Sequence, residues 1–343
     1  MNKRRAITLT KLWNRTIALG AAAAMLLSGC GAATSAESTN TDTAVQASAA
    51  AQNDTDLVDI MELTENEIPL ADAPKSSMLL PQASGAKVQS NDKAVIDYSN
   101  IADGYVMVKY TASTSQKLKV IVKGPTTTYT YNLAADKAWD TYPLSDGNGS
   151  YTVGVYENVS GTKYAGVLSQ TFSVTLKDEF APFVRPNQYV DYENAPKTVA
   201  KAAELVKGKS TDLDKVQAVY DYVVKNITYD KQLAASVKSG YLPVLDTVLT
   251  KKTGICFDYA ALMAGMLRSQ GIPCKLVVGY AGQAYHAWIS VYTKENGWVE
   301  GVIYFDGTSW QRMDPTFAST GNQSSTVMQY IGDGKNYTVK YLY

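Results

Sequence analysis

Residues 254–260 read Gly-Ile-Cys-Phe-Asp-Tyr-Ala, and they open the segment that decides the fold of the C-terminal half of the chain. After them apolar side chains recur every three or four residues, and Gly271 and Pro273 follow as helix-ending residues. The pattern predicts a helix over residues 256–270 that begins at Cys256. A thiol at this position is a candidate nucleophile, because free N–H groups and the helix dipole favour the thiolate.

Two residues that work with a nucleophilic thiol lie downstream. His286 is the only histidine among the 343 residues, in Ala-Tyr-His-Ala-Trp, and Asp314 lies in Met-Asp-Pro-Thr. Acyl transfer needs a thiolate to attack a carbonyl carbon, an imidazole to take and return a proton, and a carboxylate to orient the ring. We therefore predict Cys256 as nucleophile, His286 as general base facing the N-terminus of the Cys256 helix, and Asp314 as the residue that orients it.

An oxyanion that forms during acyl transfer requires hydrogen-bond donors beside the nucleophile. The backbone N–H of Cys256 is expected to be one donor, because the first N–H groups of a helix have no partner within the helix. Tyr229 is a candidate for the second donor, although a structural core tyrosine is the preferred interpretation of that residue.

The remaining cysteine of the C-terminal half is Cys274, next to Pro273 at the start of a strand. We interpret it as a buried apolar residue. A helix between the two cysteines separates Cys256 from Cys274 by roughly 20 Å, too far for a disulfide. One histidine and two separated cysteines do not make the usual zinc-ligand set, so neither a metal nor another cofactor is expected.

The segments around this helix predict an α+β fold. A helix is expected to start at residues 194–196, with Asn194 as N-cap, and a second near residues 211–214, where acidic side chains suit the helix dipole. A third helix is expected over 244–250. Strands are expected after the Cys256 helix, at residues 275–280, 284–292, 298–305, 309–313 and 337–343. Helices followed by an antiparallel sheet are the α+β arrangement.

Residues 93–178 have a different pattern. Short runs of alternating apolar and polar residues, rich in Val, Tyr and Thr, are separated by turn-forming residues such as Asp146 to Gly149. This pattern predicts a small all-β sandwich of five to seven strands, immunoglobulin-like in size. We interpret it as a spacer or docking module, because it contains no pairing of a nucleophile with a base.

Residues 195–320 resemble the transglutaminase-like core of the papain-like cysteine enzymes. The resemblance implies that residues 187–343 are the catalytic domain, with Cys256, His286 and Asp314 as its catalytic residues, and that the substrate is a peptide or protein. It is carried by four motifs in order, with a fifth upstream: Gly-Ile-Cys-Phe-Asp-Tyr-Ala at 254–260, Leu-Arg-Ser-Gln-Gly-Ile-Pro at 267–273 leading into Val-Gly-Tyr at 278–280, His-Ala-Trp at 286–288, Asp-Pro-Thr at 314–316, and Ile-Thr-Tyr-Asp at 227–230.

This family includes transglutaminases, peptidases, amidases and members without catalytic activity. We expect a thioester-forming peptidase or amidase that acts on peptide or cell-wall amide bonds, since water is the abundant acceptor outside a cell. Two alternatives remain. One is a transglutaminase that crosslinks proteins, and the other is a non-catalytic surface binding or adhesion protein that reuses the fold.

The first 29 residues are expected to be an export signal. A basic start is followed by eleven apolar residues at 17–27, about 16 Å as a helix, which is too short to cross a bilayer core of ~30 Å. The signal ends in Leu-Ser-Gly-Cys, which resembles a bacterial lipobox. This resemblance implies cleavage before Cys30, lipidation of its thiol and an extracytoplasmic protein anchored to the cell membrane. Residues 30–92, rich in Ala, Ser, Thr and acids, are expected to be a disordered tether.

The net charge excludes one class of partner. The whole chain has 32 basic and 32 acidic residues, but the five basic residues before Cys30 would leave with the signal, giving 27 against 32 and a charge of −5. A mildly acidic protein offers no electrostatic basis for binding nucleic acid.

Overall fold

The structure is a computed structural model, and it describes residues 78–294, 297–299, 302–305, 310–312 and 337–343. The expected signal sequence, Cys30 and Asp314 all lie outside the described residues. None of the helices in this described part is long and apolar enough to cross a membrane.

The N-terminal described region is all β, as predicted. Two four-stranded sheets have the strand orders β1-β2-β3-β6 and β5-β4-β7-β8, with antiparallel pairing throughout. The strands are β1 (Val88–Ser90), β2 (Ala94–Asp97), β3 (Tyr105–Tyr110), β4 (Leu118–Lys123), β5 (Thr128–Leu133), β6 (Asp140–Pro143), β7 (Gly149–Ser160) and β8 (Lys163–Val174). Alternation decides which side chains are buried, as in β4, where every second residue is in the core. The immunoglobulin-like classification stays a prediction.

The tether was predicted to reach residue 92, and that boundary is wrong. β1 pairs with β2 in register Val88↔Asp97, and Gly85 donates its N–H to the Asp97 carboxylate at 2.7 Å. The polar composition of residues 78–92 does not predict these contacts. β1 is an exposed edge strand held by main-chain hydrogen bonds, so it needs no pattern of buried apolar side chains.

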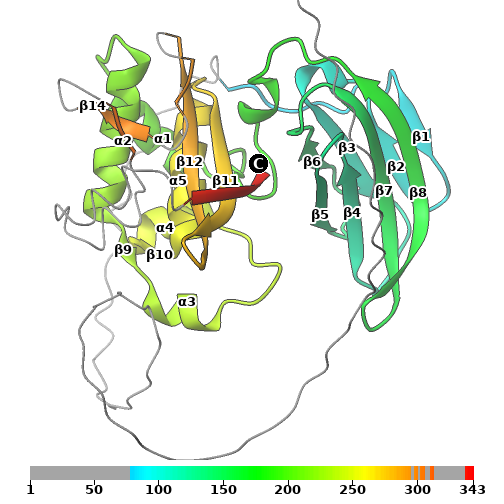
Figure 1. The fold of residues 1–343 in the computed structure, drawn as a ribbon. Coiled ribbons are helices and arrows are strands. Elements are labelled where there is room, and N and C mark those ends of the chain that lie inside the picture. The colour runs from blue at the N-terminus through cyan, green and yellow to red at the C-terminus, as the bar shows by residue number, and fades with distance from the viewer. Residues whose placement is uncertain (1–77, 295–296, 300–301, 306–309, 313–336) are drawn as a thin grey trace, which may run out of the picture. The chain divides into compact units, whose positions relative to one another are not determined.

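The C-terminal region is the predicted α+β arrangement (Figure 1). Its main sheet has the order β13-β12-β11-β16, so β16, drawn in red, pairs with β11 although the two are far apart in sequence. The helices are α1 (Pro196–Val206), α2 (Asp212–Asn226), α3 (Lys231–Ser236), α4 (Leu245–Lys251) and α5 (Cys256–Ser269). The strands are β9 (Thr228–Tyr229), β10 (Thr253–Gly254), β11 (Cys274–Ala281), β12 (Ala284–Thr293), β13 (Gly297–Val299), β14 (Val302–Phe305), β15 (Trp310–Arg312) and β16 (Tyr337–Leu342).

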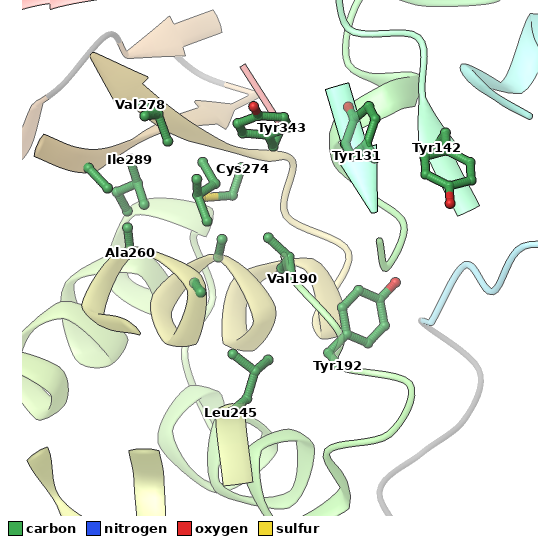
Figure 2. Close-up of a cluster of buried hydrophobic side chains, with 14 of the residues drawn as sticks. Tyr131, Tyr142, Val190, Tyr192, Leu245, Ala260, Cys274, Val278, Ile289 and Tyr343 are labelled. Carbon is green, nitrogen blue, oxygen red and sulfur yellow. The ribbon is translucent and has the colours of Figure 1, made fainter. Parts of the chain in front are cut away.

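Helix α5 lies against the main sheet and is the centre of this region. Every residue of α5 from Asp258 to Ser269 is buried, so this helix is apolar on nearly all sides. Figure 2 shows Cys274 and Val278 of β11 and Ile289 of β12 above α5, where Ala260 lies. The sheet face that contacts α5 therefore consists of alternate residues of β11 and β12.

Two details of the predicted elements are wrong. Asn194 does not cap α1; its side chain binds Asp191, and the free N–H groups of α1 are instead bound by Asp246 of α4. The single strand expected over 298–305 is two strands, because β13 pairs with β12 whereas β14 pairs with β15. In the first case a residue distant in sequence decides the local structure, whereas in the second each strand pairs with a neighbour along the chain.

Candidate active site

Cys256 is the first residue of α5, as predicted, and a buried carboxylate holds the turn before it. Asp258 accepts the N–H of Ile255 at 2.8 Å and the hydroxyl of Tyr241 at 2.7 Å. Gly254 leaves room for this return of the chain, because a Cβ there would lie 2.6 Å from the Asp258 Cβ. The sequence Gly-Ile-Cys-Phe-Asp therefore builds the helix start from its own side chains.

The segment before α3 holds the same turn through strand pairing and main-chain hydrogen bonds. β9 pairs in parallel with β10, which places Tyr229 opposite Gly254. The N–H of Asp230 donates to the carbonyl of Gly254 at 2.9 Å, and the hydroxyl of Tyr259 donates to the carbonyl of Ile227 at 2.6 Å. This places the Ile-Thr-Tyr-Asp motif beside the residues that lead into Cys256. The role of Tyr229 as an oxyanion donor stays a prediction.

The two cysteines have different surroundings, and both are free thiols. Cys256 is partly exposed at the start of α5, whereas Cys274 is fully buried in the core between α5 and the sheet (Figure 2). Burial raises the pKa of the Cys274 thiol to about 12. A thiol with so high a pKa is almost entirely protonated at neutral pH, and the prediction that Cys274 is a core residue is confirmed.

His286 is the third residue of β12 and pairs with Gly279 of β11. Its side chain is only 7% exposed and lies over Trp288, with the ring centroids 6.2 Å apart. Since side chains on a strand alternate between faces, His286 and Trp288 share one face, and Ala287 and Ile289 share the other, which packs on α5. The imidazole therefore lies on the face of β12 opposite to the one that packs on α5.

The start of β12 lies close to the start of α5. Tyr285, the residue before His286, lies on the face of β12 that packs on α5. The pKa of Tyr285 is raised first by burial and then by the nearby Tyr341, Tyr280 and Cys256 groups. The structure thus brings Cys256 near the segment that carries His286. The hydrogen bond between the thiol and the imidazole stays a prediction, as does the role of Asp314.

Tyr241 is a residue of this site that sequence reasoning missed. It lies between α3 and α4 and binds Asp258, so it supports the helix start from a part of the chain without a recognisable motif. Asp258 was interpreted as structural, which its hydrogen bonds confirm.

A separate cavity lies near the other end of α5. It has a volume of about 260 Å³ and is lined by residues that include Ser145, Asp178, Lys275 and Trp298. The ammonium of Lys275 lies 3.9 Å from the centroid of the Trp298 ring. Because β11 starts at the C-terminal end of α5, this cavity is remote from Cys256 and does not belong to the candidate active site.

Comparison with known proteins shows what the C-terminal region is similar to. Residues 199–315 match the transglutaminase-like superfamily, a range that covers Cys256, His286 and Asp314. Over 117 residues the chain is 31% identical to the uncharacterized protein YebA of Bacillus subtilis, across 29% of this chain and 16% of YebA. Over 153 residues it is 24% identical to the kyphoscoliosis peptidase of Mus musculus, across 39% of this chain and 23% of that protein.

A shorter sequence match and a solved structure with limited similarity were also found. Over 68 residues the chain is 32% identical to a protein-glutamine gamma-glutamyltransferase of Pseudomonas aeruginosa, across 16% of this chain and 10% of that protein. A crystal structure described as a candidate cysteine protease of Cytophaga hutchinsonii has 17% identity and a TM-score of 0.35, over 70% of this chain and 83% of that one. The chain thus spans less than a quarter of the length of each curated relative named here. The similarity to the transglutaminase-like superfamily is located at residues 199–315.

Proposed function

The chain contains a transglutaminase-like domain over residues 199–315, and from this premise we propose that it is a cysteine acyl-transfer enzyme. Its reaction is hydrolysis of amide bonds in peptides, including cell-wall peptides. The protein is exported and held at the outer side of the cell membrane by a lipid on Cys30. Within this proposal Cys256 is the nucleophile, His286 the general base and Asp314 the carboxylate that orients the imidazole.

The reaction has two steps. His286 takes the proton of the Cys256 thiol, the sulfur attacks the carbonyl carbon, and the amine leaves with that proton as the thioester forms. Water then loses a proton to His286 and attacks the thioester, which releases the acid and restores the thiol. The backbone N–H of Cys256 is placed at the helix start to stabilise the oxyanion in both steps.

The observation that carries the proposal is the contrast between the two thiols. Cys256 begins a helix, is partly exposed and lies next to the segment that contains the only histidine, whereas Cys274 is enclosed in the core. A helix start favours a thiolate, and burial opposes one. The names of the relatives support both hydrolysis and acyl transfer to an amine, since one is a peptidase and another a glutamyltransferase.

Thiol labelling tests the nucleophile. Full-length membrane-fraction protein is treated with iodoacetamide and the modified peptides are identified by mass spectrometry. We expect Cys256 to be alkylated well before Cys274, and His286→Ala to slow the alkylation of Cys256. The same spectra should show a lipid on Cys30 as the N-terminal residue. Cys274→Ala is the matched control and should leave the labelling of Cys256 in place.

Activity separates hydrolysis from crosslinking. Peptides and cell-wall fragments are incubated with wild type, Cys256→Ala and His286→Ala, with and without a primary amine. Hydrolysis adds water to the acyl product, and crosslinking adds the amine. Loss of the general base should slow the reaction by roughly 10²- to 10⁴-fold. Equal labelling of the two cysteines, together with turnover by Cys256→Ala, would contradict the proposed chemistry and favour a binding protein.

A further inference from the structure

We propose that Tyr280 and Tyr285 form a binding platform for an apolar side chain of the substrate beside Cys256. The proposal rests on the proposed function and adds to it a preference for substrate sequence. It starts from the exposure of two large aromatic residues. Tyr280 is 38% and Tyr285 59% exposed, whereas the neighbouring positions of the same two strands are mostly buried.

The two tyrosines form one surface. Tyr280 of β11 and Tyr285 of β12 are directly opposite each other in the register of the two strands, so their side chains leave the same face of the sheet. The ring centroids are 5.5 Å apart and the ring planes are at 67°, an edge-to-face pair. Such a pair presents a rigid apolar surface, since each tyrosine restricts the other.

This surface lies on the Cys256 side of the sheet. Tyr280 and Tyr285 alternate in phase with Val278 and Ala287, which belong to the core beneath α5. β11 starts at the C-terminal end of α5 and runs back along it, so the turn between β11 and β12, which carries Tyr280 and Tyr285, lies toward the N-terminal end of α5, where Cys256 is. In agreement, Cys256 is one of the groups that raise the pKa of Tyr285, after the larger effects of burial, Tyr341 and Tyr280. A substrate bound for attack by Cys256 would therefore reach the platform with a side chain next to the reacting amide.

Further aromatic residues extend the platform toward the residue after the nucleophile. The rings of Tyr189 and Tyr343 lie 4.5 Å apart between centroids. The pKa of Tyr189 is raised first by burial and then by Tyr285, and that of Tyr343 by burial, Tyr189 and then Tyr285. Tyr189 packs against Phe257, with ring centroids 5.5 Å apart. This aromatic group adjoins the nucleophile in sequence, because Phe257 is the residue after Cys256 on α5.

The chemistry of this surface selects its ligand. The contacts that the structure gives here are between aromatic rings: Tyr280 pairs with Tyr285, and Tyr189 packs against Phe257. Aromatic rings without a charged neighbour favour aromatic or aliphatic side chains over acidic ones. The expected substrate therefore has a residue such as Phe or Leu adjacent to the amide bond that is attacked.

Peptidyl electrophiles test the platform. Short peptides that differ only in one residue, Phe, Gly or Asp, are coupled to a chloroacetamide, and the rate of Cys256 alkylation in the full chain is measured for each. Wild type should react about tenfold faster with the Phe reagent than with the Gly reagent, the ratio that corresponds to one good aromatic contact. Tyr285→Ala and Tyr280→Ala should lose this preference, and Tyr285→Phe should keep it.

Two controls separate this proposal from the proposed function. Tyr164→Ala, in the β7–β8 hairpin, should behave like wild type. Binding of the Phe and Gly peptides to Cys256→Ala, measured by calorimetry, tests the platform without the nucleophile. An equal response to both reagents in wild type, or a preference unchanged in the double tyrosine variant, would overturn the platform. Failure of iodoacetamide to label Cys256 would instead count against the nucleophile alone.

Discussion

Asp258 shows how one side chain can set the geometry of a reactive residue two positions before it. Its carboxylate turns back over Gly254 and accepts the N–H of Ile255, so the chain enters α5 in one conformation with Cys256 at the start. The pKa of Asp258 is raised, mainly by burial, although the hydrogen bonds from Tyr241 and Ile255 oppose the rise. The molecule thus keeps a carboxyl group here at a cost in stability when it is ionised.

We predict that Asp258→Asn changes the pH dependence of stability. The pKa of Asp258 is higher in the folded state than in the unfolded state, where it is about 4. The contribution of Asp258 to the free energy of unfolding is therefore fully present below about pH 4 and is lost as the pH rises through the pKa of the folded state. Asn keeps the shape of the side chain and does not ionise. The free energy of unfolding of wild type should therefore fall relative to that of the variant as pH rises above about 4.

Urea unfolding at a series of pH values from about 3.5 to 7, a range that brackets ordinary aspartate titration, measures this difference. Asp214→Asn, on the exposed first turn of α2, is the control and should show no such trend. A constant difference between wild type and Asp258→Asn at every pH would contradict the prediction.

At the scale of elements, α1 depends on a residue of another helix. The first N–H groups of a helix need acceptors, and residue 195, which precedes α1, is an alanine without one. Asp246 in the first turn of α4 fills this role: it accepts the N–H of Lys197 at 3.1 Å and both the N–H and the hydroxyl of Thr198 at 2.8 Å. One carboxylate thereby joins α1 to α4, and α4 leads directly to the turn before Cys256.

We expect Asp246→Ala to lower the free energy of unfolding by about 2 kcal/mol, the upper part of the range for the loss of an N-cap, because three hydrogen bonds are lost. Asp246→Asn retains one acceptor oxygen and should cost less. Asp214→Ala removes an acid from the first turn of α2, where Thr211 remains as the cap, and should cost less than about 1 kcal/mol. Chemical denaturation measures all three, and equal losses for Asp246→Ala and Asp214→Ala would contradict the tertiary cap.

At the scale of the whole molecule, Tyr343 connects the all-β region to the α+β region. Its ring contacts Tyr129 and Tyr131 of β5, at 5.7 and 5.8 Å between centroids, and Tyr189 at 4.5 Å. Its carbonyl accepts a hydrogen bond from the guanidinium of Arg268 at 2.6 Å, and this buried guanidinium also binds the carbonyl of Cys274. The end of β16, the start of β11 and the sandwich are thus fixed to one another, as the shared cluster in Figure 2 shows.

We predict that Tyr343→Ala destabilises the protein by roughly 3–5 kcal/mol, the usual cost of removing a buried aromatic ring. The main-chain bonds of residue 343 remain, so the change isolates the ring contacts. Calorimetry of wild type should give one main transition, whereas the variant should unfold in two, with the all-β region separating from the α+β region. Tyr164→Ala is the control for a partly exposed tyrosine within the sandwich. A single transition at an unchanged temperature in Tyr343→Ala would contradict this account.

The sequence by itself determined the features that depend on neighbours along the chain. The start of α5 at Cys256, the start of α2 near residues 211–214, the all-β pattern and the buried state of Cys274 follow from periodicity, acidic residues in a first turn and a flanking proline, which act within a few residues. The motif order also indicated the resemblance to the transglutaminase-like superfamily, whose model matches residues 199–315.

Only the tertiary structure decided the features that depend on residues far apart. The pairing of β16 with β11, the cap of α1 by Asp246 and the support of Asp258 by Tyr241 need partners that no local pattern specifies. The same holds for the face of β12 on which His286 lies, since alternation gives two faces and only packing on α5 distinguishes them. These contacts form because they bury apolar surface and at the same time provide hydrogen-bond partners for main-chain N–H and C=O groups. Both conditions are met only when the whole chain is folded.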